Sequence, residues 1–306
     1  MKAVGVTGPD YMPRLFDIDE PVASRGGVVV EVLAASVNDF DRAAVEGRVA
    51  LTSQLDPVLL GRDFVGRVTA VGHDVDYIDV GMNVAGTMEA WRSGTFTDSV
   101  EVPAELLAPV PDGVDVAQAA GVGLAAITAL DAVGVLGSTN LGTTVIHGPV
   151  TEVGGFAIQL AKARSAVVAV VTPSAQADLA WALGADVVIT EGADATQTIQ
   201  GVRDFFGGGV DNAIHLAGDP SIAARVVRPG GKCTSVSDAA TPAIRTDVEY
   251  IPTVVAPSGH KLADLLFKVA AQRLHSNIGR TFSFDEAGDA VNADHTSAGG
   301  RTVLVR

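Results

Sequence analysis

The sequence predicts an α/β protein with two domains, and three observations support this prediction. The chain has 306 residues, which is about twice the usual length of one domain. Up to about Gly121, short apolar runs are separated by Gly, Pro and Asp, a pattern typical of a compact β-rich domain. From about Leu124 to Pro257, apolar runs alternate with helical segments, which indicates a parallel sheet covered by helices on both faces.

The β-rich domain is expected to take in both ends of the chain. Its clearest predicted strands are Val28–Ala34, Gly66–Gly72 and Phe96–Pro103. After a break at residues 257–259, apolar residues at helical spacing predict a helix at Leu262–Ala271, and a last strand is expected at Thr302–Val305. We therefore assign residues 1–121 with 258–306 to this first domain and residues 122–257 to the second.

In the second domain, continuous apolar runs predict the strands of the parallel sheet. These runs are Thr143–Ile146, Val167–Val171, Asp186–Thr190, Val210–Ala217 and Gly231–Val236. Helical segments follow the first three of them, at Gly154–Arg164, Gln176–Leu183 and Thr196–Phe206. Alternation of strand and helix in this order predicts a doubly wound sheet.

Composition excludes several function classes. Lys and Arg number 21 and Asp and Glu number 36, so the formal net charge is 21 − 36 = −15, and such a surface repels nucleic acids and anionic membranes. No apolar run reaches the ~18 residues of a membrane span, and the amino terminus lacks a signal-peptide core. One cysteine, Cys233, cannot form an internal disulfide. We expect a soluble, cytoplasmic protein that binds neither nucleic acid nor membrane.

The segment from Val145 to Lys162 carries the most chemical information. It places a strand, a glycine-containing turn and a helix in succession, as a Rossmann unit does. Glycines let such a turn bend tightly and let a pyrophosphate approach, and the unpaired N–H groups at the start of the helix face the phosphates. The segment therefore predicts dinucleotide binding.

The sequence resembles the zinc-free, quinone-oxidoreductase-like branch of the medium-chain dehydrogenase/reductase superfamily over nearly its whole length. The segments that carry the resemblance are 33–41, 61–66, 71–72, 119–129, 147–162, 183–186, 228–231 and 300–304. The resemblance implies a GroES-like β-barrel domain, a Rossmann-type domain and an active site in the cleft between them. It further implies NADPH-dependent reduction of quinones, enones or related carbonyls, often by a homodimer.

The residues at the zinc positions of the family do not suit zinc. Zinc-dependent relatives need a cysteine after the third strand and a His-Glu pair in a Gly-His-Glu turn, where this chain has Ser36 and Gly61-Arg62-Asp63. Zinc needs thiolate, imidazole or carboxylate ligands, and Arg62 would repel a cation. The structural four-cysteine loop is also missing, so we expect no metal. The six histidines show no metal-ligand pairing, and we interpret each as structural.

The phosphate-binding turn departs from the family pattern at two positions. Thr151 and Glu152 stand where relatives usually have glycines, while the helix-packing Gly154 is kept. Thr151, Glu152, Val153 and Gly154 are the cofactor-binding candidates of this turn. A side chain at Thr151 would crowd the pyrophosphate, and Glu152 would compete with the phosphates for N–H groups. Two interpretations stay open: Glu152 points to solvent and the cofactor still binds, somewhat weakened, or dinucleotide affinity is largely lost.

The end of the second Rossmann strand favours NADPH over NADH. NAD sites usually carry an acid there that holds the ribose 2′-OH, but this chain has Thr172-Pro173-Ser174 and no acid before Asp178. Thr172 or Ser174 could bond a 2′-phosphate, although no Lys or Arg stands beside them. A helix-capping role for Ser174 is the alternative.

Further cofactor-binding candidates rest on the resemblance. Thr128 matches a threonine near the cofactor at a helix start, with a core threonine as the alternative. Ala217 and Gly218 follow the fourth strand, where the family's backbone passes the adenosine ribose. Arg301 stands for the family's lysine before the last strand, from which a cation can reach the cofactor phosphates.

The catalytic candidates are Asn38, Asp41 and Tyr11. Asn38 matches the family asparagine near the nicotinamide, and a turn-stabilising role is its alternative. Asp41, at the family's Asn-x-x-Asp spacing, would orient substrate or water, or else cap a helix. Tyr11 would donate a proton after hydride transfer.

Together these observations predict an NADPH-dependent oxidoreductase that reduces quinones or α,β-unsaturated carbonyls by hydride transfer without zinc. Two alternatives stay open. One is a repurposed family member with weak or no dinucleotide binding, and the other is a biosynthetic ketone or enoyl reductase.

Overall fold

The computed structural model describes residues 1–8, 10–49, 57–89, 92, 94–150, 152–237, 245–293 and 300–306. The chain forms two compact units, Met1–Ile127 with Pro257–Arg306 and Thr128–Ala256. The division falls inside a helix, α3 (Gly123–Leu136), whereas the boundary expected from sequence at residues 121 and 122 precedes it. A β-rich unit and a parallel-sheet unit confirm the predicted fold class.

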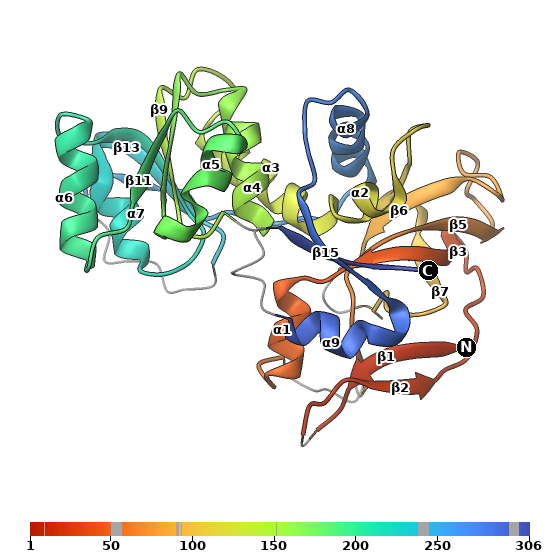
Figure 1. Ribbon diagram of the computed structural model, residues 1–306. Coiled ribbons are helices and arrows are strands. Elements are labelled where there is room, and N and C mark those ends of the chain that lie inside the picture. Colours follow the sequence, from red (N-terminus) through yellow and green to blue (C-terminus); the bar gives the residue numbers. More distant parts are fainter. Residues whose placement is uncertain are drawn as a thin grey trace. The chain divides into compact units, whose positions relative to one another are not determined.

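The first unit is built around one long strand, β3, which runs from Gly27 to Ser36 (Figure 1). It pairs antiparallel with β5, β7 and the C-terminal strand β16, so the two ends of the chain share one sheet. Valines 28, 30 and 32 of β3 are fully buried, and each buried side chain of this size contributes about 1.5–3 kcal/mol. A second, smaller sheet in the order β2-β1-β4 completes the strands described in this unit.

The elements of the first unit are β1 (Lys2–Val6), β2 (Arg14–Asp17), β3, α1 (Asp39–Val45), β4 (Val58–Leu59), β5 (Asp63–Val71), β6 (Asn83–Thr87), β7 (Ser99–Pro103), η1 (Ala104–Leu106), β8 (Leu107–Pro109), α2 (Val116–Ala120) and the start of α3, then α8 (Gly259–Ala270), β15 (Ile278–Ser283), η3 (Phe284–Glu286), α9 (Ala287–Asn292) and β16 (Arg301–Val305).

In the second unit, the described strands form one parallel sheet in the order β11-β10-β9-β12-β13-β14. After α3 its elements are β9 (Thr143–His147), α4 (Glu152–Lys162), β10 (Val167–Thr172), η2 (Ser174–Gln176), α5 (Ala177–Ala182), β11 (Val187–Thr190), α6 (Ala195–Phe205), β12 (Val210–His215), α7 (Pro220–Val226), β13 (Val227–Ser235) and β14 (Glu249–Tyr250). The strand order reverses between β9 and β12, and ligands of open parallel sheets bind at the carboxyl ends of the strands at such a point.

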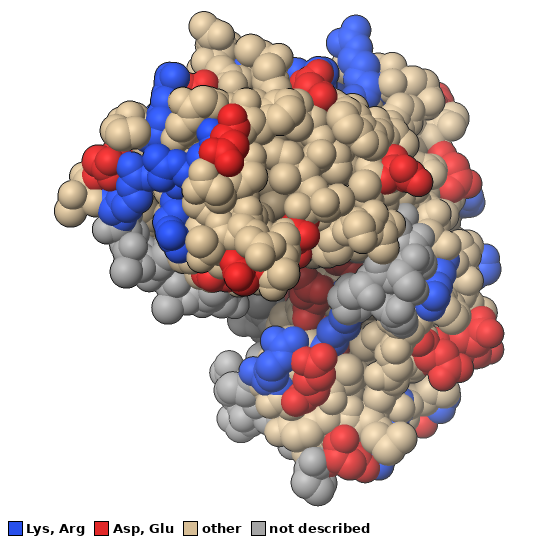
Figure 2. All heavy atoms as spheres, turned by 60° about the vertical axis from the view of Figure 1, so that its left-hand side comes forward, with Lys and Arg blue, Asp and Glu red and all other residues tan. Residues whose placement is uncertain are grey.

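The surface carries both signs of charge. On the face drawn in Figure 2, Asp and Glu side chains are scattered among the Lys and Arg side chains. Within the described part of the chain, no helix has the length and apolar character needed to cross a bilayer.

Candidate functional site

The carboxyl edge of the parallel sheet in the second unit is the candidate functional site. His147 ends β9, His215 ends β12, and the two residues lie opposite each other in the parallel register. A glycine with positive φ comes soon after each strand, Gly148 at 124° and Gly218 at 90°. Glycine adopts such a backbone conformation readily, whereas other residues are strained in it. Both turns at the reversal point therefore depend on glycine.

The turn after β9 brings α4 close to the sheet. A Cβ atom at Gly154 would lie 2.3 Å from the carbonyl oxygen of Pro149, so the helix can approach only with glycine there. The N–H of Val150 donates to Oε1 of Gln176 at 2.8 Å. One backbone donor of the predicted phosphate-binding turn is therefore already engaged by a side chain that the sequence did not single out.

Glu152 is the first residue of α4 and is only 7% exposed. This corrects the interpretation in which Glu152 points to solvent. Val153 beside it is half-buried, and Thr151 lies outside the described residues. A carboxylate at this place adds negative charge at the end of the helix where phosphates would bind.

The end of β10 holds the two candidate partners of a 2′-phosphate. Thr172 is fully buried, and its hydroxyl donates to Oε1 of Gln176 at 3.2 Å. Ser174 begins η2 and is exposed. Of the two, Ser174 is the one whose hydroxyl lies at the surface. No pattern in the sequence indicated this role of Gln176, because Val150 lies 26 residues away from it and meets it only in the folded chain.

The remaining cofactor-binding candidates of the second unit are Thr128, Ala217 and Gly218, and they belong to two different segments. Thr128 is in α3 and is 8% exposed. Ala217 and Gly218 are exposed directly beyond β12, where they border the candidate site.

His147 and His215 form a buried pair, each 1% exposed. Their Nδ1 atoms are 3.2 Å apart, and the rings stack with centroids separated by 5.3 Å. Nε2 of His147 lies 3.5 Å from Oε1 of Glu191, which follows β11. Burial lowers the pKa of His147 to about 4, with the neighbouring His215 acting in the same direction and Asp219 against it. Burial also lowers the pKa of His215, so both imidazoles are neutral at pH 7.

Sequence reasoning interpreted these histidines as isolated structural residues. Their pairing depends on β9 and β12 being neighbours, although 68 residues separate them. The available signal was that each histidine ends an apolar strand shortly before a glycine.

In the first unit, the carboxylate of Asp63 is the centre of a buried polar cluster. Its Oδ2 accepts from Ser36 Oγ at 2.8 Å and from Asn38 Nδ2 at 2.9 Å, and it forms an ion pair with Arg301 Nη2 at 3.2 Å. Further donors to Oδ1 are Thr87 Oγ1 at 2.9 Å and Leu124 N at 2.7 Å. The sequence singled out Asp63 only as part of a missing zinc motif.

This cluster decides the positions of two predicted site residues. Arg301, expected to reach cofactor phosphates, is 1% exposed, and its guanidinium donates to Ser36, Asn38 and Asp63. Asn38, expected near the nicotinamide, uses its Oδ1 for Arg301 and its Nδ2 for Asp63 and the Ser36 carbonyl. Both side chains therefore hold β3, β5 and β16 together.

The side chain of Asp41 is also engaged in hydrogen bonds within the first unit. Fully buried in α1, it accepts from the N–H of Asn38 at 2.8 Å and of Gly61 at 2.6 Å. Burial raises the pKa of Asp41 to about 6, opposed by the nearby Arg62. Tyr11 has φ 51° and is half-buried, with its ring 3.0 Å from where a Cβ of Gly47 would lie.

The residues at the family's zinc positions have other partners. Arg62 is 2% exposed and donates to the carbonyl oxygens of Leu59, Glu89 and Arg92. Among the described residues, no group of three or more His, Cys, Asp or Glu side chains could hold a metal ion.

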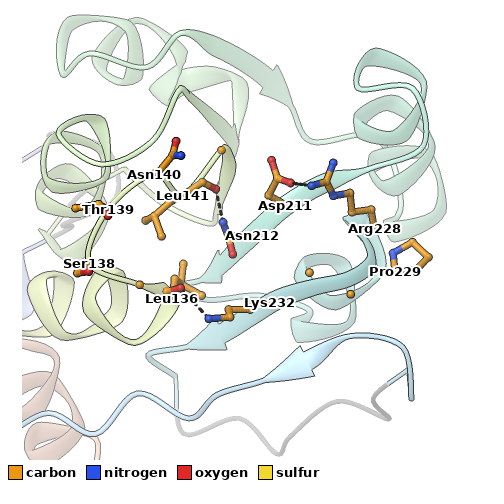
Figure 3. A pocket seen from close by; sticks show the side chains of 14 residues that line it. Leu136, Ser138, Thr139, Asn140, Leu141, Asp211, Asn212, Arg228, Pro229 and Lys232 are labelled. Atoms are coloured by element: carbon orange, nitrogen blue, oxygen red, sulfur yellow. Dashed lines mark hydrogen bonds and ion pairs between the residues drawn. The ribbon is translucent and has the colours of Figure 1, made fainter.

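A pocket of about 720 Å³ lies at the opposite, amino-terminal edge of the same sheet (Figure 3). Arg228 pairs with Asp211, Asn212 donates to the carbonyl of Leu141, and Lys232 Nζ donates to the last carbonyl of α3 at 3.2 Å. The Asn212 bond fastens the loop between α3 and β9 to β12, the Lys232 bond fastens the end of α3 to β13, and the ion pair joins β13 to β12. Since parallel sheets bind ligands at their carboxyl ends, this pocket is not the candidate site.

One unit is β-rich and takes in both ends of the chain, and the other has a parallel sheet with a glycine-containing turn; these are the two domains that the resemblance to dehydrogenases and reductases implies. Comparison with known proteins agrees: residues 24–112 match the alcohol dehydrogenase GroES-like domain and residues 153–252 match the zinc-binding dehydrogenase domain. The chain belongs to the medium-chain dehydrogenase/reductase superfamily and has an alcohol dehydrogenase-like fold.

Individual relatives are distant. The chain is 35% identical to the mitochondrial NAD(P)H oxidoreductase RTN4IP1 of Homo sapiens over 180 residues, 53% of this chain and 46% of that protein. It is 29% identical to the chloroplastic NADPH-dependent alkenal/one oxidoreductase of Arabidopsis thaliana over 245 residues, 77% of this chain and 61% of that protein. The match thus spans about half of the human protein.

Among solved structures, mycobacterial Rv1454c complexed with NADPH is similar with a TM-score of 0.85 at 24% identity, over 100% of both chains.

Proposed function

We propose that the protein is an NADPH-dependent oxidoreductase that reduces quinones or α,β-unsaturated carbonyls by hydride transfer without zinc. The observation that carries the proposal is the carboxyl edge of the parallel sheet, where β9 and β12 lie side by side and each runs into a turn that contains a glycine with positive φ. Within the described residues, the buried Nε2 of His215 at this edge has no hydrogen-bond partner, which suits a site completed by a ligand. The relatives named for NADPH-dependent and NAD(P)H oxidoreductases support the same function.

The chain's own residues would bind and orient the cofactor. Gly154 allows α4 to approach the turn, Ser174 would face the 2′-phosphate, and Ala217 with Gly218 would border the ribose. The nicotinamide supplies the hydride chemistry when it is bound. The protein's contribution is then to hold the reacting carbons in contact and to exclude water.

The preference for NADPH rests on the end of β10. The chain has no acid at Thr172, Pro173 or Ser174, so the usual acceptor of a ribose 2′-OH is missing there. The zinc-free chemistry is supported by Arg62, whose buried guanidinium occupies the family's metal-ligand position. The homodimer and the cytoplasmic location remain predictions.

A second candidate is a repurposed member of the family with weak dinucleotide binding. It is favoured by the buried Glu152 at the start of α4 and by Gln176, which already engages the N–H of Val150. Both features reduce the capacity of the turn for phosphate.

Calorimetric titration with NADPH and with NADH tests the proposal. We expect micromolar binding of NADPH and binding of NADH that is several-fold weaker. The double substitution Thr151→Gly with Glu152→Gly should tighten NADPH binding, because it removes a side chain and a negative charge from the turn. If neither nucleotide binds the native sequence at millimolar concentration while the double variant binds NADPH, the second candidate is correct. If the native protein binds NADPH, turnover of quinones and enones is assayed next.

A further inference from the structure

Three side chains from three strand ends form a line across the candidate site. Glu191 follows β11, His147 ends β9 and His215 ends β12. The side chain of Glu191 reaches past β10 to His147, and His147 meets His215 through their Nδ1 atoms. One end of this line is a carboxylate that is 36% exposed, and the other end is a buried imidazole nitrogen.

The protons in this line can be assigned from the partners. A neutral imidazole carries one N–H, so the 3.2 Å contact between the Nδ1 atoms needs a proton on one of them and a lone pair on the other. If His147 carried its proton on Nδ1, its bare Nε2 would face the carboxylate of Glu191, and two acceptors repel. The opposite arrangement gives His147 an Nε2–H that faces Glu191. His215 then donates from Nδ1 to Nδ1 of His147.

This tautomer leaves Nε2 of His215 as a lone-pair acceptor. The atom is buried and has no hydrogen-bond partner among the described residues. The nearby carboxylate of Asp219 cannot supply one, because it is itself an acceptor and is bonded to the N–H of Ser221 at 2.8 Å. An unsatisfied buried acceptor is unfavourable, and a ligand that brings a donor to this place removes that penalty.

We infer that Glu191 is a positioning residue that fixes the tautomer of the histidine pair, so that His215 Nε2 accepts a hydrogen bond from a ribose hydroxyl of the bound dinucleotide. This inference rests on the proposed function. Phosphate oxygens are acceptors and are disfavoured beside the same lone pair, whereas ribose hydroxyls donate. The histidine pair thus selects which part of the dinucleotide lies at the end of β12, next to the exposed Gly218.

The first test is the tautomeric state, read by long-range ¹H–¹⁵N correlation of the histidine rings at pH 7. We expect the Nε2–H tautomer for His147 and the Nδ1–H tautomer for His215. The imidazole signals are assigned by comparison with His147→Asn and His215→Phe, each of which lacks one set of them. The substitution Glu191→Gln should raise the population of the reversed pair, since an amide can either donate to or accept from His147. A native protein in which His215 carries its proton on Nε2 overturns the inference.

The second test is binding of NADPH, followed by calorimetry and by the ¹⁵N shift of His215 Nε2. We expect NADPH to move this shift, and His215→Phe, which keeps the ring but not the acceptor, to weaken binding about three- to tenfold. His73→Phe, at an exposed position of the first unit, is the matched control and should bind as the native protein does. Circular dichroism and thermal unfolding of each variant show that it is folded.

The outcomes separate the inference from the proposed function. If NADPH binds without moving the ¹⁵N shift of His215 Nε2, and His215→Phe binds NADPH as tightly as the native protein, the inference fails and the proposed function stands. If the native protein does not bind NADPH at all, the proposed function fails and the hydroxyl-acceptor role fails with it.

Discussion

Replacing Arg301 with methionine should destabilise the first unit and leave NADPH affinity almost unchanged. The guanidinium of Arg301 and the carboxylate of Asp63 are both 1% exposed and lie 3.2 Å apart. Methionine has a similar length without the charge, so the substitution leaves the carboxylate buried with its neutral donors but without its cation. The structure therefore predicts a loss of stability, whereas the role expected from sequence predicts a loss of phosphate binding.

The magnitude follows from the burial of both groups. At an effective dielectric of ~20, two charges at this distance attract by about 5 kcal/mol. Desolvation offsets much of that attraction in the native pair, but removing one partner of a buried pair costs about 3–5 kcal/mol, because the other charge stays buried. Asp63→Asn combined with Arg301→Met should recover part of the loss, since neither member of this pair then carries a charge.

Urea unfolding followed by circular dichroism measures the effect. The matched control is Arg25→Met, which removes an Arg–Asp pair of the same unit whose arginine is 84% exposed, and it should change the free energy of unfolding by less than about 1 kcal/mol. The reasoning is refuted if Arg301→Met costs no more than this control. A large loss of NADPH affinity at unchanged stability would restore the phosphate role of Arg301.

Three further predictions concern the second unit. Gly154→Ala should destabilise it by about 1–3 kcal/mol in urea unfolding, because a Cβ there would lie 2.3 Å from the Pro149 carbonyl; Gly201→Ala, in the open middle of α6, should instead be neutral or stabilising. The folded pKa of His147, about 4, lies below its usual 6.5, so stability should fall by up to about 3 kcal/mol as pH drops from 6.5 to 4, because the unfolded chain takes up a proton that the folded one excludes. His147→Asn should make that pH dependence shallower, and an equal slope in both proteins would contradict the pKa. Burial raises the pKa of Cys233 to about 12, so iodoacetamide at pH 7.5 should label it only on unfolding, and rapid labelling of the native protein would show an accessible thiolate instead.

The sequence by itself determined most of the second unit's architecture. Its continuous apolar runs and the helical segments between them are local patterns, and β10 and α4 begin or end within about two residues of where these patterns placed them. The order of motifs along the chain likewise indicated the superfamily, because those motifs are short segments readable without knowing their neighbours in space.

Only the tertiary structure decided what the polar side chains do. Arg301 and Asp63 are 238 residues apart and meet because β16 and β5 both pair with β3. His147 and His215 meet because the strand order places β12 beside β9. A buried charge or imidazole takes its role from the groups that replace water around it, and those groups come from distant segments. The same residue types at the same positions in sequence could have faced solvent or a cofactor, and strand pairing turned them into a buried ion pair and a histidine pair.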